Sequence, residues 1–259
     1  DPGIKVVGSA PEPHAARHLM RELDPDVVTL DVEMPGMDGL SFLEKIMRLR
    51  PTPVVMCSSL TTHAAEVTIE ALRLGAVDFV AKPSGNGGDM KRATAELCEK
   101  VKAAARSRVR QSRDVPQTGP VAAVDGPFAE DRLIVIGSST GGVDALFAIL
   151  PSLPQNAPPV LVVQHMPPSF TASLARRLDG SCAMKVMEAY DRAPLERGTV
   201  YIAPGGDTHM VLSGKTVRLV EGDRVSGHRP SVDMLFRSVA TLGRKAVGVI
   251  LTGMGEDGA

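Results

Sequence analysis

Tryptophan is absent from this chain, which holds only two tyrosines and six phenylalanines. The core of any folded domain must therefore be built mainly from Val, Leu, Ile, Met and Ala. An excess charge of one sign is also missing, because 29 Lys and Arg stand against 30 Asp and Glu. The protein as a whole therefore has no strong field that would attract nucleic acid or anionic lipid.

Long hydrophobic runs and paired cysteines are missing as well. No apolar run approaches the roughly 20 residues that span a bilayer, so we expect no membrane insertion. Cys57, Cys98 and Cys182 lie far apart and form no metal-type pair. We expect them to be reduced structural thiols in a cytoplasmic protein. Because the chain starts at Asp1 and stops just after a glycine-rich loop, we expect both ends to be truncated.

Short apolar runs alternate with amphipathic stretches in the first third of the chain. We predict strands at Ile4–Val7, Val27–Leu30, Pro53–Cys57 and Phe79–Ala81, and helices at His14–Leu23, Leu40–Leu49 and Ala64–Leu74. This alternation, with strands that are apolar almost throughout, is typical of a parallel sheet covered by helices on both faces.

A basic stretch and a linker follow. The predicted helix at Met90–Ser112 lies in a region with eight Lys or Arg between Lys91 and Arg113, but no aromatic side chain interleaves them. We therefore interpret it as a solvated helix and not as a surface for nucleic acid. Prolines and glycines are frequent in Val115–Glu130, which predicts an interdomain linker.

The rest of the sequence predicts a second series of apolar strands. They are expected at Leu133–Ile136, Pro158–Val163, Val200–Ala203, Met210–Leu212, Lys215–Val220 and Ala246–Leu251. We expect Lys215–Val220 to pair with the preceding strand as a hairpin, and Ala246–Leu251 to be a buried strand. A helix is expected at Val143–Leu150.

The decapeptide LIVIGSSTGG, residues 133–142, is the most informative stretch for function. Its centre fits the G-x-S-x-G nucleophile elbow, in which a serine, here Ser139, lies on a sharp turn between a strand and a helix. Glycines allow the turn, and the free N–H groups at the helix start favour a developing oxyanion. A glycine-rich turn that only packs or binds phosphate has the same pattern. A dinucleotide loop would need glycine in place of Ser139, and a Walker loop would need a lysine after Gly142.

Ser139, His165 and Asp257 each come just past the end of a predicted parallel strand. Loops at that edge of an open α/β sheet form the active crevice, so these residues can meet in space. An imidazole can then take the proton of the hydroxyl while a carboxylate orients the imidazole. Backbone N–H groups near Met254 and Gly255 would complete an oxyanion site. Rival positions are His209 and His228 for the base, and Asp207 and Asp233 for the acid.

The first domain has a similar arrangement, because Asp31, Ser58 and Lys82 end or follow three successive predicted strands. A carboxylate can accept a phosphoryl group. Lys82 would then pair with the added charge, and the Ser58 hydroxyl would donate a hydrogen bond to it. An ordinary ion pair between Asp31 and Lys82 would give the same pattern.

These residues match known families. Leu30–Leu40, together with Val54–Ser59 and Phe79–Pro83, resembles the receiver domain of response regulators. Residues 131–259 resemble the methylesterase domain of chemotaxis protein-glutamate methylesterases. The motifs that carry this second resemblance are Gly137–Gly142, Gln164–Pro168, Ala203–Gly206, Arg229–Asp233 and Gly248–Ala259.

The resemblance implies a fold and a division of the chain. It implies an α/β protein with a truncated flavodoxin-like receiver domain and a second, doubly wound α/β methylesterase domain. The partial receiver would occupy residues 1–84, without its first strand and helix, and a helix with the interdomain linker residues 85–130. The methylesterase domain would occupy residues 131–259, without its C-terminal part.

The resemblance also implies an activity, the hydrolysis of glutamate methyl esters on methyl-accepting chemotaxis receptors and the deamidation of certain receptor glutamines. Both reactions set sensory adaptation. Ser139 matches the family's nucleophile, His165 its base and Asp257 its orienting acid. Met254 matches a position whose backbone N–H contributes to the oxyanion hole, and Thr140 matches a residue that helps to hold the histidine. No cofactor is expected for hydrolysis.

For the receiver, the resemblance implies phosphorylation of Asp31 by the chemotaxis histidine kinase, with Ser58 and Lys82 as helpers. The receiver would cover the esterase site until phosphorylation relieves the block. Receivers bind Mg²⁺ partly through an acidic pair on a first strand that this sequence does not show, so the ion needs ligands beyond Asp31 and the Glu33 carbonyl. We expect the complete protein to use Mg²⁺, and this fragment to be phosphorylated poorly and to be less stable and less active.

Two other functions stay open on the sequence alone. One is a phosphorylation-dependent binding module whose second domain has lost catalysis, although no triad position is substituted. The other is a nucleotide-dependent oxidoreductase. A transcription regulator is disfavoured, because no helix-turn-helix pattern or basic surface domain is present.

Overall fold

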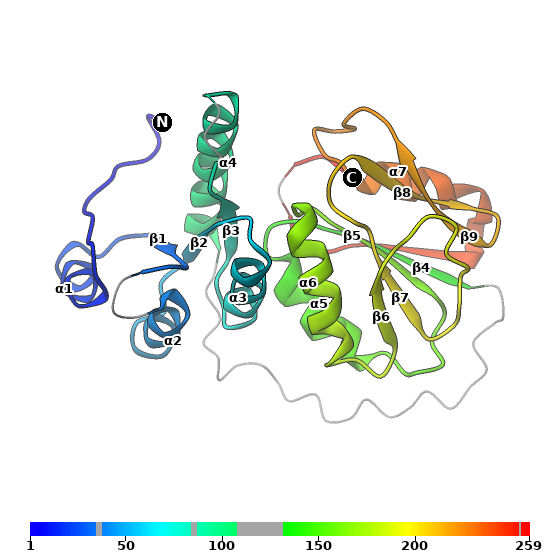
Figure 1. Cartoon of the computed structure of the whole chain (residues 1–259), viewed down its shortest axis with the longest axis horizontal. Coiled ribbons are helices and arrows are strands. Elements are labelled where there is room, and N and C mark those ends of the chain that lie inside the picture. The colour runs from blue at the N-terminus through cyan, green and yellow to red at the C-terminus, as the bar shows by residue number, and fades with distance from the viewer. Residues whose placement is uncertain (35–37, 84–86, 108–131, 254) are drawn as a thin grey trace. The chain divides into compact units, whose positions relative to one another are not determined.

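The computed structural model describes residues 1–34, 38–83, 87–107, 132–253 and 255–259. The chain divides into two compact units, Asp1–Gln117 and Thr118–Ala259, and each is described by itself (Figure 1). None of the helices in the described ranges is both long and apolar enough to cross a membrane.

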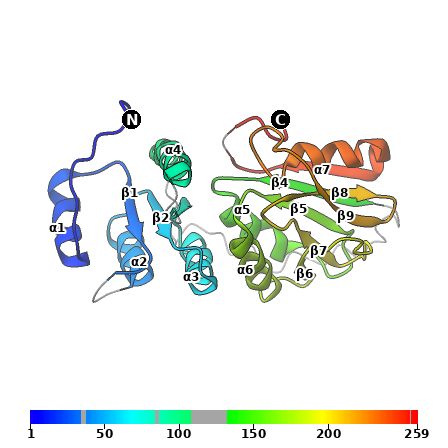
Figure 2. The same cartoon turned by 45° about the horizontal axis from the view of Figure 1, so that its top comes forward.

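The first unit is a three-stranded parallel sheet in the order β1-β2-β3. Its strands are β1 (Val28–Asp31), β2 (Val54–Ser58) and β3 (Asp78–Ala81), and its helices are α1 (Pro13–Leu23), α2 (Gly39–Leu49), α3 (Thr62–Arg73) and α4 (Gly87–Arg106). Figure 2 shows α2 and α3 on one face of this sheet and α4 on the other. The predicted parallel sheet with helices on both faces is confirmed.

Local signals explain where these helices begin and end. The Asp38 side chain accepts a hydrogen bond from the Ser41 N–H at the start of α2, and Thr61 does the same for Ala64 at the start of α3. Such caps satisfy backbone donors that have no partner within the helix. Gly75 follows α3 with a φ of 110°, the left-handed conformation that ends many helices.

The predicted strand at Ile4–Val7 is wrong. Val6 is 82% exposed and Val7 45% exposed. The backbone of this segment pairs with no strand of the described chain. A short apolar run becomes a strand only when a neighbour supplies hydrogen bonds and buries its side chains, so this segment stays irregular.

The basic helix is solvated on only one side. Leu97, Val101 and Ala104 of α4 pack against the first sheet. The Lys100 ammonium on α4 donates to the Phe79 carbonyl and pairs with Asp78 at 3.3 Å. The interpretation of this segment as a solvated helix leading into a linker is therefore corrected, because one side of α4 covers the sheet. Its predicted continuation and the predicted linker lie outside the described residues.

The second unit is built on a five-stranded parallel sheet in the order β10-β4-β5-β7-β6. The strands are β4 (Leu133–Ser138), β5 (Val160–Gln164), β6 (Lys185–Glu188), β7 (Thr199–Ile202) and β10 (Ala246–Ile250). Helices α5 (Gly142–Ile149) and α6 (Pro168–Asp179) lie on one face, and α7 (Val232–Val239) lies on the other (Figures 1 and 2). The predicted doubly wound arrangement is thereby confirmed.

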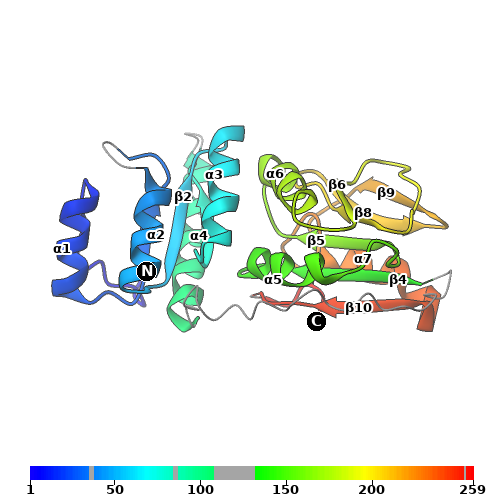
Figure 3. The ribbon, with the colours of Figure 1, turned by 90° about the horizontal axis from the view of Figure 1, so that it is seen from below.

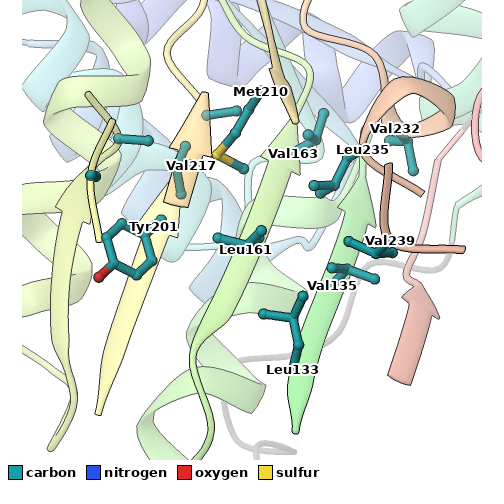
Figure 4. Close-up of a cluster of buried hydrophobic side chains, with 13 residues drawn as sticks. Leu133, Val135, Leu161, Val163, Tyr201, Met210, Val217, Val232, Leu235 and Val239 are labelled. Carbon is teal, nitrogen blue, oxygen red and sulfur yellow. The ribbon is translucent and has the colours of Figure 1, made fainter. Parts of the chain in front are cut away.

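An antiparallel hairpin of β8 (Thr208–Ser213) and β9 (Thr216–Glu221) confirms the predicted pairing. Its core contacts join the hairpin and α7 to the sheet (Figure 4). The labelled cluster consists of Leu133, Val135, Leu161, Val163, Tyr201, Met210, Val217, Val232, Leu235 and Val239. Burying each large apolar side chain contributes about 1.5–3 kcal/mol, so this layer holds α7 firmly against the strands.

Strand β10 is present, but the prediction that it is buried is wrong. Figure 3 shows β10 along one edge of the sheet, beside β4. Val247 is 48% exposed and Ile250 51% exposed. An apolar run predicts a strand of a parallel sheet, but it does not distinguish a central strand from an edge strand. The sequence analysis also missed α6, β6 and α7.

Candidate active site

The predicted elbow is present between β4 and α5. Ser139 follows the last residue of β4, and its N–H donates to the Thr252 carbonyl at 3.0 Å. Gly141 has a φ of 74° and caps α5, so a glycine suits this position. A Cβ on Gly142 would lie 2.3 Å from Oε1 of Gln164, which leaves no room for a side chain.

The Gln164 side chain joins the turn that carries Ser139 to the strand that precedes His165. Ser138 and Gln164 are register partners on β4 and β5. The Ser138 hydroxyl donates to Gln164 Oε1 at 2.7 Å, and Gln164 Nε2 donates to the Ser139 carbonyl at 2.9 Å. The His165 N–H donates to the Ser138 carbonyl at 3.2 Å. Ser139 and His165 therefore follow paired residues of adjacent strands, at the same edge of the sheet.

Asp257 and His165 are in direct contact, and both side chains are largely buried. The distance from His165 Nε2 to Asp257 Oδ2 is 2.8 Å, and the two side chains are 12% and 1% exposed. The Asp257 carboxylate also accepts from the Val232 N–H at 2.7 Å, the Asp233 N–H at 3.0 Å and the Ser231 hydroxyl at 2.7 Å. The start of α7 thus holds this carboxylate.

These contacts keep Asp257 ionised. Burial alone would raise its pKa, but the hydrogen bonds from His165, the Asp233 N–H, the Ser231 hydroxyl and the Val232 N–H outweigh burial and lower the pKa to about 2. The positive end of the α7 dipole favours the same charge state. At neutral pH the site therefore holds a carboxylate that can orient the imidazole.

The two nitrogens of His165 have different surroundings. Nε2 faces Asp257, whereas Nδ1 is buried and has no hydrogen-bond partner among the described residues. In a neutral imidazole that donates Nε2–H to Asp257, Nδ1 carries the free lone pair. Ser139 and His165, both in the described chain, share no hydrogen bond, and such a bond often tightens only when substrate is present.

The rival histidines and carboxylates have other contacts. His209 is fully buried, accepts the Ser231 N–H at Nδ1 and lies 2.8 Å from the Asp223 carbonyl at Nε2. It therefore fixes the residue that caps α7. Asp207 pairs with Arg229. The other rivals are His228, which stacks on His165, and Asp233, which accepts from the Gly258 N–H and the Ser226 hydroxyl.

The remaining predicted residues of this site are only partly described. The Thr140 carbonyl accepts a hydrogen bond from the Thr252 hydroxyl at 3.0 Å. That Thr140 helps to hold His165 stays a prediction. Met254 lies outside the described residues, and so does its predicted part in an oxyanion hole. Gly255 lies in the same loop with a φ of 112°.

In the first unit, the structure brings Asp31 and Lys82 together. Lys82 Nζ lies 2.6 Å from Asp31 Oδ2, and the side chains are 41% and 37% exposed. The Ser58 hydroxyl is fully buried and accepts from the Thr68 hydroxyl at 2.8 Å. It is thus engaged with α3, and its predicted bond to a phosphoryl group stays a prediction.

A divalent metal does not fit this edge with the residues at hand. Mg²⁺ requires close to octahedral coordination by oxygen. The Asp31 carboxylate and the Glu33 carbonyl supply only part of such a shell. Within the described ranges, no group of three or more His, Cys, Asp and Glu side chains could hold a metal ion.

Sequence reasoning missed the supports of the site. Gln164 and Ser231 hold the two ends of the arrangement, and neither was singled out as a functional position by itself. A signal for α7 does exist, since Ser231 precedes Val232 and Asp233 as a helix cap with an acidic first turn. No simple pattern in the sequence indicates that His228 stacks on His165.

Both units of this chain are similar to known proteins. The family CheB methylesterase matches residues 134–259, and the response regulator receiver domain matches residues 1–93. Protein-glutamate methylesterase/protein-glutamine glutaminase 1 of Caulobacter vibrioides is 56% identical over 264 residues, which cover 100% of this chain and 76% of the relative. Its counterpart in Rhizobium johnstonii is 52% identical over 263 residues, covering 100% and 75%. The crystal structure of the Thermotoga maritima CheB methylesterase catalytic domain has 45% identity and a TM-score of 0.46, over 49% of this chain and 70% of that one.

Proposed function

Because this chain belongs to the family of chemotaxis protein-glutamate methylesterases, in which a receiver domain precedes a CheB methylesterase domain, we propose that Ser139, His165 and Asp257 perform its hydrolytic chemistry. The protein is a methylesterase that hydrolyses glutamate methyl esters and a glutaminase that converts glutamine to glutamate, under phosphorylation control. The buried contact between His165 and Asp257, at the strand edge where Ser139 lies, is the observation that supports these roles most strongly.

Acylation starts at Ser139. His165 Nδ1 takes the proton of the hydroxyl as Oγ attacks the carbonyl carbon of the ester, and the carbonyl oxygen becomes an oxyanion. N–H groups near Met254 and the positive end of α5 would stabilise that charge. When the intermediate collapses, the methoxy oxygen takes the proton from Nδ1 and leaves as methanol. The glutamyl group is then bound to Ser139 as an ester.

Deacylation repeats these steps with water. His165 takes a proton from water, the hydroxyl attacks the acyl carbon, and the Ser139 oxygen leaves with the proton that Nδ1 returns. The product is a free glutamate side chain. For a glutamine, ammonia replaces methanol as the leaving group. Asp257 stays ionised throughout and stabilises the imidazolium cation.

The family assignment implies chemoreceptor glutamates as the substrate and a kinase as the partner of the receiver domain. We propose more specifically that the substrates are methyl-accepting chemotaxis receptors, that the phospho-donor is the chemotaxis histidine kinase, and that the protein works in the cytoplasm. Modification of the receptors would then set sensory adaptation. Hydrolysis is proposed to need no cofactor.

For regulation, we propose Asp31 as the phospho-acceptor and Lys82 as the cation that balances the added charge. An Asp31 oxygen attacks the phosphorus as the bond to the donor histidine breaks. Receiver phosphorylation is usually Mg²⁺-dependent, and we propose that requirement for the complete protein without assigning further ligands. Asp31→Asn should leave unstimulated hydrolysis within about twofold of wild type and abolish stimulation by a phospho-donor. Persistent stimulation would show that Asp31 is not the switch.

The test of the hydrolytic assignment is methanol release from methylated receptor. Ser139→Ala should remove the nucleophile and lower the rate by about 10⁴-fold or more. Ser138→Ala is the matched control, because it removes the neighbouring hydroxyl, which donates to Gln164 and to the Val163 carbonyl. It should destabilise the turn but retain measurable release. Retained release in Ser139→Ala would refute the assignment and favour a module that binds without catalysing.

A further inference from the structure

Two histidine rings lie flat against each other at the strand edge. The imidazoles of His165 and His228 have centroids 3.7 Å apart and an angle of 4° between their planes. We propose that His228 is a positioning residue whose ring holds the His165 imidazole in the orientation that proton transfer from Ser139 requires. This inference rests on the proposed function, because it takes His165 as the base.

Hydrogen bonding alone holds only one side of the His165 ring. Nε2 bonds to Asp257, whereas the buried Nδ1 has no partner among the described residues. A ring fixed by a single hydrogen bond can tilt about that contact, and a tilt displaces Nδ1 from the proton that it must take. A flat contact on the face of the ring removes this freedom without occupying Nδ1.

The segment that carries His228 is a tight turn. Val225 and His228 exchange two backbone hydrogen bonds, of 3.1 Å and 3.0 Å. Ser226 and Gly227 between them have φ values of 51° and 81°. Two successive positive φ values are characteristic of the type I′ turn, whose backbone is narrowly defined. The His228 ring is therefore presented from a well-defined backbone.

Side chains that precede and follow His228 in the sequence hold this turn to the start of α7 and to the segments at Gly206 and Gly222. The Ser226 hydroxyl donates to Asp233 at 3.0 Å, at the start of α7. The Arg229 guanidinium donates to the Gly206 carbonyl at 3.1 Å and to the Gly222 carbonyl at 2.6 Å. The start of α7 also holds Asp257. The start of α7 therefore positions both partners of His165: Asp257, which bonds to Nε2, and His228, which stacks on the face of the ring.

The stack also suits the charge that forms during the reaction. His165 becomes a cation when it takes the proton of Ser139. A neutral aromatic face next to a cation is favourable, whereas a second cation at this distance would oppose proton transfer. The proposed role of His228 thus requires a flat aromatic face against His165. An aromatic ring without nitrogen atoms should therefore replace it in large part.

The test compares two replacements in the full chain. His228→Ala removes the ring and should lower kcat for methanol release by about 10- to 100-fold, with KM within about twofold, because small displacements of a catalytic group have effects of this size. His228→Phe restores a flat face and should recover kcat to within about fivefold of wild type. Labelling of Ser139 by a serine-hydrolase probe should slow in the same order.

Controls separate this role from general stability and from the proposed function. Tyr190→Ala removes a half-exposed ring elsewhere in the same unit and should leave kcat unchanged. Far-UV circular dichroism establishes that each variant is folded at the assay temperature. A wild-type kcat in folded His228→Ala, or equally slow His228→Ala and His228→Phe variants, would overturn the inference. Activity in Ser139→Ala would overturn the proposed function instead.

Discussion

Each of the two parallel sheets carries an aspartate paired with a basic side chain at the carboxyl ends of its strands, but the two pairs differ in exposure. In the second unit, Asp257 is 1% exposed and bonds to His165 while three further donors from the start of α7 hold it. In the first unit, Asp31 is 37% exposed and Lys82 41% exposed, and the pair meets in reach of solvent. Both edges are the carboxyl ends of parallel strands, where α/β proteins place their chemistry.

The difference in exposure matches the two roles that we propose for these residues. A hydrolytic site gains from charges that are already oriented in a dry environment, because nothing then has to reorganise when the oxyanion and the imidazolium form. A phospho-acceptor has to be reached by the phosphoryl group of another protein, so its carboxylate must stay accessible. Removing one partner of a buried, hydrogen-bonded charge lowers the free energy of unfolding strongly, whereas removing one partner of an exposed ion pair changes it little.

The largest expected effect is on catalysis at the buried edge. Asp257→Asn keeps the size of the side chain but removes the carboxylate that orients His165. By analogy with other serine hydrolases, kcat should fall by about 10⁴-fold. Steady-state methanol release measures it. A loss of less than tenfold would mean that Asp257 does not orient the base.

Lowering the pH should show how much the ionised Asp257 carboxylate contributes to the stability of the fold. The pKa of Asp257 is about 2 in the folded protein against an ordinary value of 3.8. Its ionised form therefore stabilises the fold fully above about pH 4, and this stabilisation is lost as the pH falls toward 2. Between pH 5 and pH 3 the free energy of unfolding should fall by about 1 kcal/mol more in wild type than in Asp257→Asn. Urea unfolding followed by circular dichroism tests this, and parallel pH profiles for the two proteins would contradict it.

The smallest effect is expected at the exposed edge. Lys82→Ala removes the partner of Asp31, but the free energy of unfolding should change by less than about 1 kcal/mol, because solvent already screens both groups. The same urea experiment at low and high salt is the measurement. A loss of several kcal/mol would show that the receiver edge is as strongly coupled to the fold as the hydrolytic edge.

The sequence was sufficient to select candidate residues at the ends of the parallel strands, but not to predict the helix and the side chains that surround them. Ser139, His165 and Asp257 could be selected because parallel strands place their carboxyl ends at one edge, and this rule needs only the order of apolar runs. The helix at Val232–Val239 was missed, although Ser231 and Asp233 give it the cap and the acidic first turn of a helix start. The start of that helix supplies three of the four hydrogen bonds that lower the pKa of Asp257, and His165 supplies the other.

Other outcomes depended on tertiary neighbours. The apolar run Ile4–Val7 has no strand partner in the described chain, and β10 lies at a sheet edge that the sequence could not indicate. The stack of His228 on His165 brings together residues 63 positions apart, through a turn and a helix start. Such contacts are set by packing and have no local periodicity.

The central claim is that Ser139 is a nucleophile activated by the His165–Asp257 pair. The most direct measurement is to label the full chain with a fluorophosphonate probe and to locate the adduct by peptide mass spectrometry. We expect one adduct, on Ser139, and at least a hundredfold slower labelling of His165→Ala, since the hydroxyl is then not activated. An adduct on another residue, or undiminished labelling without His165, would contradict the account.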